Sequence, residues 1–309
     1  MTGVTLRRAG DVALRRSPAQ AVFTRRAARR LAVLAYHGVD DPGQFARQLD
    51  HVVRHAAPVS LDAVLAALSG GPPLPPHAVL VTFDDGFRSV LDAGLPLLRE
   101  RGVPAVAFVL PGLLDTRQPF WWTEATLLHD AGARAAGTPT TSAAALVGWL
   151  KTVPDTRRVE VVEELRAAAP GVDTSMGQLS RQELAILLEG GVAIGNHTWT
   201  HPCLDRCDTA EVTRQVVDAH DTIREVLGHP PRAFAYPNGN HDLRAEGLLG
   251  ELGYEAAFLF DHRLAQAPGP ASDRLRISRL RVGTETSLDR FATILSGLHP
   301  AVHHARGGR

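Results

Sequence analysis

The feature that most constrains the fold is a repeated alternation of short apolar runs with longer segments of helical pattern. This alternation predicts βα units joined into a parallel sheet or barrel. The run AVLVTF at 78–83 is apolar towards both faces, as a buried parallel strand requires. The predicted strands cover residues 31–36, 78–83, 103–110, 191–195, 233–236, 254–260 and 276–282.

Helical segments lie between these runs and carry their own start and stop signals. The segment Val90–Arg101 ends at Gly102, and Ser180-x-x-Glu183 is a capping-box signature that opens the next helix. The other predicted helices lie within 44–55, 58–68, 155–168, 209–227, 243–252 and 287–298.

Residues 115–178 interrupt this alternation. They contain the aromatic cluster Phe120-Trp121-Trp122, a Gly/Thr/Ser/Ala-rich stretch around 136–146 and the charged helix near 155–168. Because the segment shows too little apolar periodicity for a core of its own, we expect an insertion within one barrel domain spanning 31–309.

The first thirty residues form an arginine-rich segment with a single acid, Asp11, although the formal net charge of the chain is zero. Arginine pairs interrupt every candidate secretory signal, and no apolar run is long enough to span a bilayer. We therefore expect a cytoplasmic protein whose residues 1–30 are a solvated or disordered basic tail. Weak peripheral attachment of this segment to an anionic membrane surface is the alternative.

Two residue counts exclude particular chemistries. Lys151 is the only lysine and lies in neither a P-loop nor a Schiff-base motif. Cys203 and Cys207 are too few for a disulfide framework and lack C-x-x-C spacing, so we expect free thiols in a reducing compartment. An accessory role for them stays open.

The stretch Thr82-Phe83-Asp84-Asp85-Gly86 places two adjacent carboxylates where a buried strand ends. They would repel each other and lose hydration unless a cation or hydrogen-bond donors stabilised them. A bound metal would do so, and Gly86 would permit the tight exit that brings both side chains to one site. An ordinary Asp-Asp-Gly turn is the alternative.

His197 and His201, in HTWTH, lie one helical turn apart and also follow a strand. This spacing lets two imidazoles meet one ion on a short helix or a tight loop, although a chance pair is the alternative. Together with Asp85 they would form an Asp-His-His set with open positions for water and substrate. All three would lie at the C-terminal ends of strands, where barrel active sites occur.

The motifs TFDDG, HTWTH and FAYPNG at 234–239, in this order, resemble the NodB-homology polysaccharide deacetylases from about Leu31 to Leu298. The resemblance implies an α/β fold, an irregular (β/α) barrel with a helical insertion. It further implies that Asp85, His197 and His201 hold a divalent metal and that Asp84 is the general base. Zinc is the expected ion, with cobalt or nickel as alternatives.

The pattern is also similar to the subgroup that deacetylates poly-N-acetylglucosamine exopolysaccharides, in which an early Tyr-His motif supplies the general acid. That motif corresponds to Tyr36-His37 here. His37 would project from the end of the first strand, and a pKa near neutrality suits the protonation of an amine leaving group. A structural histidine is the alternative.

The third motif departs from the family pattern. The resemblance implies that a backbone N–H near Tyr236 stabilises an oxyanion, within the stretch Tyr236, Pro237, Asn238 and Gly239. Many family members carry an arginine where Ala235 stands here, and the family's late Leu-x-His motif is not visible. Arg279, in RISRLRV, is a candidate for the missing charge, with a surface salt bridge as the alternative.

Aromatic residues suit sugar rings because their faces accept C–H surfaces. Phe120, Trp121, Trp122 and Trp199 are therefore candidates for substrate contact. Alternatively, they attach the insertion to the barrel.

These predictions describe a metal-dependent hydrolase that removes an N-acetyl group from an N-acetylated amino sugar or polysaccharide. We expect a carbohydrate partner and no nucleic acid. Two alternatives stay open. The first is a deacylase or deformylase of a small molecule or lipid-linked sugar, favoured by the missing secretion signal. The second is a catalytically silent carbohydrate-binding protein, suggested by the missing third-motif arginine.

Overall fold

The computed structural model describes residues 3–308, with side chains from residue 8 onward, so Arg7 lies outside the described side chains. Its described strands form one parallel sheet in the order β7-β6-β5-β4-β3-β1-β8, with β2 also paired to β3. The strands are β1 Ala32–Tyr36, β2 Ala57–Pro58, β3 Ala78–Phe83, β4 Ala105–Val109, β5 Val192–Asn196, β6 Ala233–Ala235, β7 Ala256–Phe258 and β8 Leu280–Arg281.

The sheet curls until its two edges approach each other. Leu280 pairs with Leu34 of β1, whereas Ile277, three residues earlier, forms a parallel bridge to Phe258 of β7. The predicted strand at 276–282 therefore passes from one edge of the sheet to the other, and only two of its residues stay in register with β1. The predicted irregular (β/α) barrel is confirmed.

Alternate strand residues face two different apolar cores, which explains the unbroken apolar runs. In β3, Val79 and Val81 pack in a cluster with residues of the flanking helices, whereas Leu80 belongs to a second cluster that includes Phe108 and Phe258. Both faces of the strand are thus removed from water.

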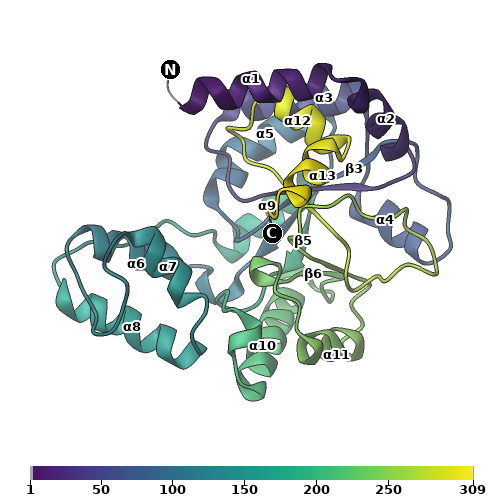
Figure 1. Ribbon diagram of the computed structural model, residues 1–309. Coiled ribbons are helices and arrows are strands. Elements are labelled where there is room, and N and C mark those ends of the chain that lie inside the picture. The colour runs from purple at the N-terminus through teal and green to yellow at the C-terminus, as the bar shows by residue number, and fades with distance from the viewer. Residues whose placement is uncertain (1–2, 309) are drawn as a thin grey trace.

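Helices connect the strands and flank the sheet (Figure 1). The predicted helix at 90–101 begins with a π-helical turn, η1 Val90–Gly94, and the predicted last helix is divided at Gly297, which has a φ of 79°. The predicted capping box at Ser180 is confirmed. The helices around the barrel are α3 Pro42–His55, α4 Leu61–Leu68, α5 Leu95–Arg101, α9 Arg181–Glu189, α10 Thr209–Leu227, α11 Leu243–Glu251, α12 Leu288–Leu295 and α13 Leu298–Ala305.

The insertion forms three helices that project to one side of the barrel: α6 Trp121–Asp130, α7 Ala143–Leu150 and α8 Asp155–Ala168 (Figure 1). The expectation that this segment lacks a core of its own is wrong. Ten buried residues, among them Leu128 and Leu165, form a separate apolar cluster. Each short helix contributes only a few of them, so the core is not visible as a periodicity in any one segment.

The arginine-rich segment forms two helices, α1 Gly3–Arg16 and α2 Pro18–Ala27, so the expectation of a disordered tail is wrong. They pack on the C-terminal helices through specific polar contacts. Asp11 accepts a hydrogen bond from Arg290 at 2.9 Å, and Gln20 accepts one from Ser296 at 2.9 Å. Among the described helices, none is long and apolar enough to cross a membrane.

Candidate metal centre and active site

The two adjacent carboxylates lie where β3 ends, at the C-terminal edge of the sheet. Asp85 adopts a left-handed backbone conformation with a φ of 70°, and Gly86 follows with a φ of 72°. This tight turn buries both carboxylates but directs them to different partners, Asp84 towards a guanidinium and Asp85 towards two imidazoles.

The two histidines lie on a tight loop after β5 rather than on a helix. Thr198 and His201 both have positive φ, 75° and 61°, a strained conformation for non-glycine residues. Side chains hold the loop in this shape. Asn196 accepts a hydrogen bond from the Thr198 N–H at 2.7 Å, and the Thr198 hydroxyl accepts one from the His201 N–H at 3.1 Å.

These supporting residues were not predicted from the sequence. Gln215 on α10 adds to them, because its side-chain oxygen accepts the Thr200 N–H at 2.9 Å. An asparagine at a strand end that bonds the backbone two residues on is a recognisable turn signal, which could have identified Asn196. Gln215 carries no such signal, since only the tertiary fold brings α10 beside the loop.

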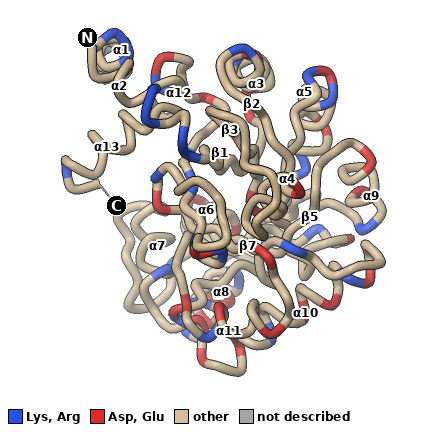
Figure 2. Tube along the Cα trace, turned by 90° about the vertical axis from the view of Figure 1, so that its right-hand side faces the viewer, with Lys and Arg blue, Asp and Glu red and all other residues tan. Residues whose placement is uncertain are grey.

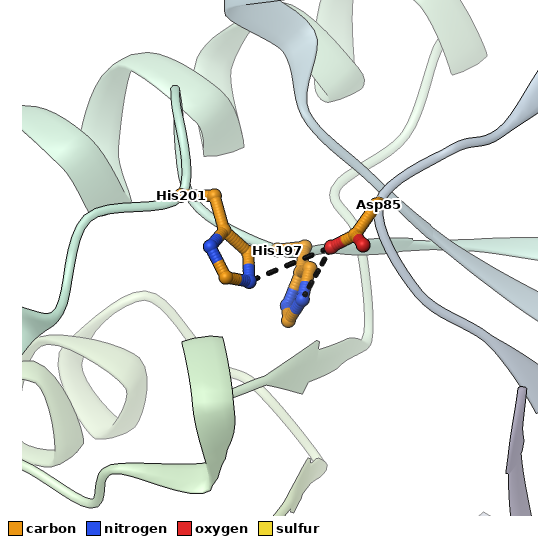
Figure 3. Close-up of side chains that lie close together, drawn as sticks. All are labelled: Asp85, His197 and His201. Atoms are coloured by element: carbon orange, nitrogen blue, oxygen red, sulfur yellow. Dashed lines mark ion pairs between the residues drawn. The ribbon is translucent and has the colours of Figure 1, made fainter. Parts of the chain in front are cut away.

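Asp85, His197 and His201 meet at one point, with ligand atoms within 4.8 Å of one another (Figure 3). The Nε2 atoms of His197 and His201 lie 3.4 Å and 3.5 Å from Asp85 Oδ1. That oxygen is buried and has no hydrogen-bond partner among the described residues. A buried carboxylate oxygen without a donor fits a cation ligand.

The tautomer of His197 also fits a metal ligand. Its Nδ1 lies 2.7 Å from the Ala235 carbonyl oxygen, which can only accept a hydrogen bond. Nδ1 therefore carries a proton, which leaves Nε2, the ring nitrogen nearest Asp85, as the one that can bind a metal. The structure thus brings one carboxylate oxygen and two imidazole nitrogens together, and their binding of a divalent ion stays a prediction.

The surroundings favour the ligating protonation states of Asp85 and His201. For His197, burial lowers the pKa, but the carboxylates of Asp84 and Asp85 raise it above its usual value. Burial would raise the pKa of Asp85, but His201 and His197 hold this pKa well below its usual range. Burial lowers the pKa of His201 to about 3. At neutral pH, Asp85 is therefore ionised and His201 is neutral.

Arg279 supplies the charge that the third motif lacks. Its guanidinium donates two hydrogen bonds to the Asp84 carboxylate, at 2.6 and 2.8 Å, and one to the Leu259 carbonyl at 2.7 Å. Burial would raise the pKa of Asp84, but Arg279 and then His197 lower this pKa below its usual value. The Arg279 side chain is 0% exposed, so the alternative of a surface salt bridge is wrong.

His37 lies at the rim of the site, just past the C-terminal end of β1. Its side chain is 47% exposed, and Nε2 is 3.9 Å from Asp85 Oδ2. Tyr36, by contrast, is buried and donates a hydrogen bond to Gln48 at 2.9 Å. Of the Tyr-His pair, only His37 can meet a substrate.

The backbone N–H groups of the third motif are largely engaged. The N–H of Tyr236 donates to the Phe258 carbonyl at 3.0 Å, and that of Gly239 donates to the Tyr236 carbonyl at 2.8 Å. The Tyr236 N–H is thus already hydrogen-bonded to β7, so this N–H is not free to donate to an oxyanion. A glycine is required at position 239 for packing, because a Cβ there would lie 2.6 Å from the Phe260 nitrogen.

The next residue of this motif contacts one of the two cysteines. The Asn238 amide lies 3.4 Å from the sulfur of Cys203. Cys203 and Cys207 are buried free thiols, as expected. Burial raises the pKa of Cys203 to about 11, so this thiol stays protonated at neutral pH.

The aromatic residues differ in how they contact the rest of the protein, and substrate contact stays a prediction. Trp121 is buried and donates from Nε1 to the His201 carbonyl at 2.9 Å, which attaches the insertion to the histidine loop. Trp122 is half-buried, stacks on Phe120 and has its ring centre 4.6 Å from that of His201, so it borders the candidate metal site. The backbone of Trp199 packs against Gly112, whose N–H donates to the Trp199 carbonyl at 3.0 Å.

Fold and site together define an α/β barrel with a candidate divalent-metal centre at the C-terminal ends of its strands. The chain belongs to the polysaccharide deacetylase family, whose family model matches residues 71–257.

Curated relatives match only a short part of the chain. A peptidoglycan-N-acetylmuramic acid deacetylase, PdaC of Bacillus subtilis, is 34% identical over 67 residues, which cover 21% of this chain and 14% of PdaC. YlxY of the same species, an uncharacterized protein, is 29% identical over 69 residues, covering 21% of this chain and 22% of YlxY. The matches span less than a quarter of either relative.

Solved structures share the whole fold at low identity. IcaB from Ammonifex degensii superimposes with a TM-score of 0.61 at 19% identity, covering 87% of this chain and 97% of IcaB. The Streptococcus pyogenes deacetylase PplD, solved in complex with acetate, gives 0.58 at 18% identity, covering 86% of this chain and 98% of PplD.

Proposed function

We propose that this protein is a metal-dependent hydrolase that removes the N-acetyl group from an N-acetylated amino sugar, in a monomer or a polymer. One observation carries the proposal. Asp85 Oδ1 is buried without a hydrogen-bond donor and lies 3.4 and 3.5 Å from two imidazole nitrogens that can bind a metal. Family membership and the name of the relative PdaC support an acetylated sugar as substrate.

Asp85, His197 and His201 would hold the ion. A divalent ion there would supply Lewis acidity towards an acyl carbonyl and towards water. Zinc is the ion we expect, with cobalt or nickel as alternatives, because the same nitrogen and oxygen donors bind all three.

The remaining steps fall to residues of this chain. Water adds to the acyl carbon, and Asp84 accepts the proton that the water gives up. Arg279 holds Asp84 ionised and fixes the orientation of its carboxylate through two hydrogen bonds. The C–N bond then breaks, and His37 donates a proton to the departing amine nitrogen, so acetate and a free amine leave.

The position of His37 supports the acid role. Its half-exposed ring can regain a proton from solvent after each turnover, while the 3.9 Å separation from Asp85 keeps it beside the reacting centre. Trp122, which borders His201, offers an aromatic face to a sugar ring.

Metal analysis and acetate-release assays on N-acetylglucosamine and its oligomers test the proposal. We expect one divalent ion per chain, and Asp84→Asn should lower acetate release by about 10²–10⁴-fold, the usual contribution of a general base. His197→Ala should lose the metal itself. Asp92→Asn, an exposed carboxylate away from the site, serves as the control.

The outcomes separate the candidates. A chain that binds no metal and releases no acetate would contradict the proposal and favour a silent binding protein. Stoichiometric metal without acetate release from any amino sugar would favour a deacylase of another small molecule.

A further inference from the structure

The two N-terminal helices carry a concentration of arginines that the described residues do not neutralise. Arg15 pairs with Asp289 at 3.1 Å, but its neighbours on these helices and on the link to β1 make no ion pair within residues 8–308. In Figure 2, where lysine and arginine are blue, blue segments lie on α1 and between α2 and β1. The exposed, unpaired side chains are Arg8, Arg16, Arg25, Arg26, Arg29 and Arg30, defined here as the arginine surface.

The chain as a whole has a formal net charge of zero, so positive charge is concentrated on this surface and the balancing acids lie elsewhere. Arginines elsewhere commonly pair with two acids each: Arg157 contacts Glu160 and Glu164, and Arg232 contacts Asp62 and Glu255. The arginine surface thus leaves an uncompensated positive field on one side of the molecule.

Helix dipoles explain the positions of only some of these arginines. Arg16, Arg25 and Arg26 lie in the last turns of α1 and α2, where a positive charge stabilises a helix. Arg8 lies in the middle of α1, and Arg29 and Arg30 lie beyond α2, outside the range of this effect. Their exposure without a partner points to a ligand outside the chain.

A cavity of about 770 Å³ opens beside this surface. Arg26, Arg30 and Arg263 lie among its lining residues, together with the apolar side chains Phe23, Leu68 and Ile277. On the same helix α2, Val22 is 49% exposed. Guanidinium groups beside apolar walls suit an amphiphilic anion, in which a phosphate adjoins hydrocarbon.

The surface lies away from the candidate active site. Arg29 and Arg30 precede β1, whereas His37 follows its C-terminal end. The five residues of β1 separate the two by about 17 Å, from a rise of about 3.3 Å per residue. Anything bound at the arginine surface would leave the mouth of the barrel open.

We propose that the arginine surface docks the protein on an anionic phospholipid bilayer, with the barrel mouth turned away from the lipid. Charge complementarity and the apolar cavity support this partner. A nucleic acid would be expected to use aromatic side chains interleaved with the arginines, and Phe23, half-buried at the cavity, is the only aromatic residue on α2.

Co-sedimentation of the full chain with lipid vesicles tests the proposal. We expect binding to vesicles of phosphatidylcholine mixed with phosphatidylglycerol, little binding to phosphatidylcholine alone, and release at high salt. Each arginine near an anionic surface contributes about fivefold, so Arg25→Gln/Arg26→Gln/Arg29→Gln/Arg30→Gln should weaken binding at least about a hundredfold.

The matched control replaces four exposed arginines that lie on α5, on the insertion and on α10: Arg99→Gln/Arg117→Gln/Arg134→Gln/Arg224→Gln. Three of them likewise make no ion pair within residues 8–308, and Arg224 pairs with Asp221 at 3.0 Å. This control should bind anionic vesicles nearly as well as the unsubstituted protein, and circular dichroism should show both variants folded. Equal binding by the two quadruple variants would overturn the proposal. So would equal binding to both kinds of vesicle, or binding to duplex DNA with none to vesicles.

Discussion

Asp84 and Asp85 are adjacent residues of the same type, but their carboxylates contact different groups. The carboxylate of Asp84 receives two hydrogen bonds from Arg279, whereas Asp85 faces two imidazoles and leaves one oxygen without a donor. A carboxylate saturated by a guanidinium is oriented and ionised, and a carboxylate without donors is available to a cation. The two carboxylates therefore differ in their contacts although they are adjacent in the sequence.

Removal of Arg279 should lower the stability of the fold as well as the rate of acetate release. Arg279→Met would leave the Asp84 charge buried without its partner, which typically costs about 3–5 kcal/mol of unfolding free energy. Urea unfolding followed by tryptophan fluorescence measures this loss. Arg279→Lys, which keeps the charge but not the two-point hydrogen bond, should lose less stability and still lower acetate release.

Arg281→Met is the matched control, two residues further along the chain. Arg281 donates to the Phe260 carbonyl at 3.0 Å and is not paired with Asp84, so we expect a loss of only about 1 kcal/mol. Similar losses of unfolding free energy for the two methionine variants would show that the contact with Asp84 contributes no more to stability than the contact of Arg281.

At the scale of elements, α6 and the histidine loop act as one unit. The Trp121 N–H bonds the His201 carbonyl, and Trp122 packs on the His201 ring. The insertion therefore restrains a loop whose backbone is strained at Thr198 and His201. We therefore expect residues 115–178 to help shape the candidate metal site.

Trp121→Phe should weaken metal binding by about tenfold or more, the usual effect of removing a supporting hydrogen bond around a metal ligand. The phenylalanine fills most of the space but cannot donate to the His201 carbonyl. Competition with a chromophoric chelator measures the affinity for zinc or cobalt.

Trp149→Phe is the control, because Trp149 packs against the same insertion core without contacting the histidine loop. It should lose some stability and keep its metal affinity. If the two variants bound metal equally well, the insertion would be independent of the site.

At the scale of the whole molecule, a buried histidine on the barrel contacts a half-buried histidine on the C-terminal helix. His262 is buried and its Nε2 lies 3.1 Å from Nδ1 of His299 on α13, while its Nδ1 accepts the Arg281 N–H at 3.1 Å. Burial, then His299 and Arg281, lower the pKa of His262 to about 3. The folded state thus holds this imidazole neutral.

Stability should therefore fall in acid. The folded pKa of His262 lies below the unfolded value of about 6.5, so its contribution is complete above about pH 6.5 and is lost as the pH falls towards 3. His262→Asn keeps an acceptor for Arg281 and tolerates the local φ of 56°. Urea midpoints should fall less for this variant than for the unsubstituted protein between about pH 7 and pH 5.

His229→Asn, at an exposed histidine, should leave that pH dependence unchanged. A His262→Asn variant with the same acid sensitivity as the unsubstituted protein would assign the effect to other groups.

Much of the fold and of the candidate metal centre was predictable from local pattern alone. Apolar runs marked the strands, with β3 at its predicted bounds, because a strand buried on both faces must be apolar at successive positions. Asp85, His197 and His201 were predictable because each follows a strand, and parallel strands bring their C-terminal ends to one edge.

Tertiary structure alone decided the rest, because those features depend on side chains far apart in the chain. Arg279 meets Asp84 only when the edges of the sheet approach each other, and the core of the insertion forms only when α6, α7 and α8 assemble. Likewise, α1 and α2 are ordered by contacts with helices at the opposite end of the sequence. Such long-range pairings leave no local periodicity for a sequence to display.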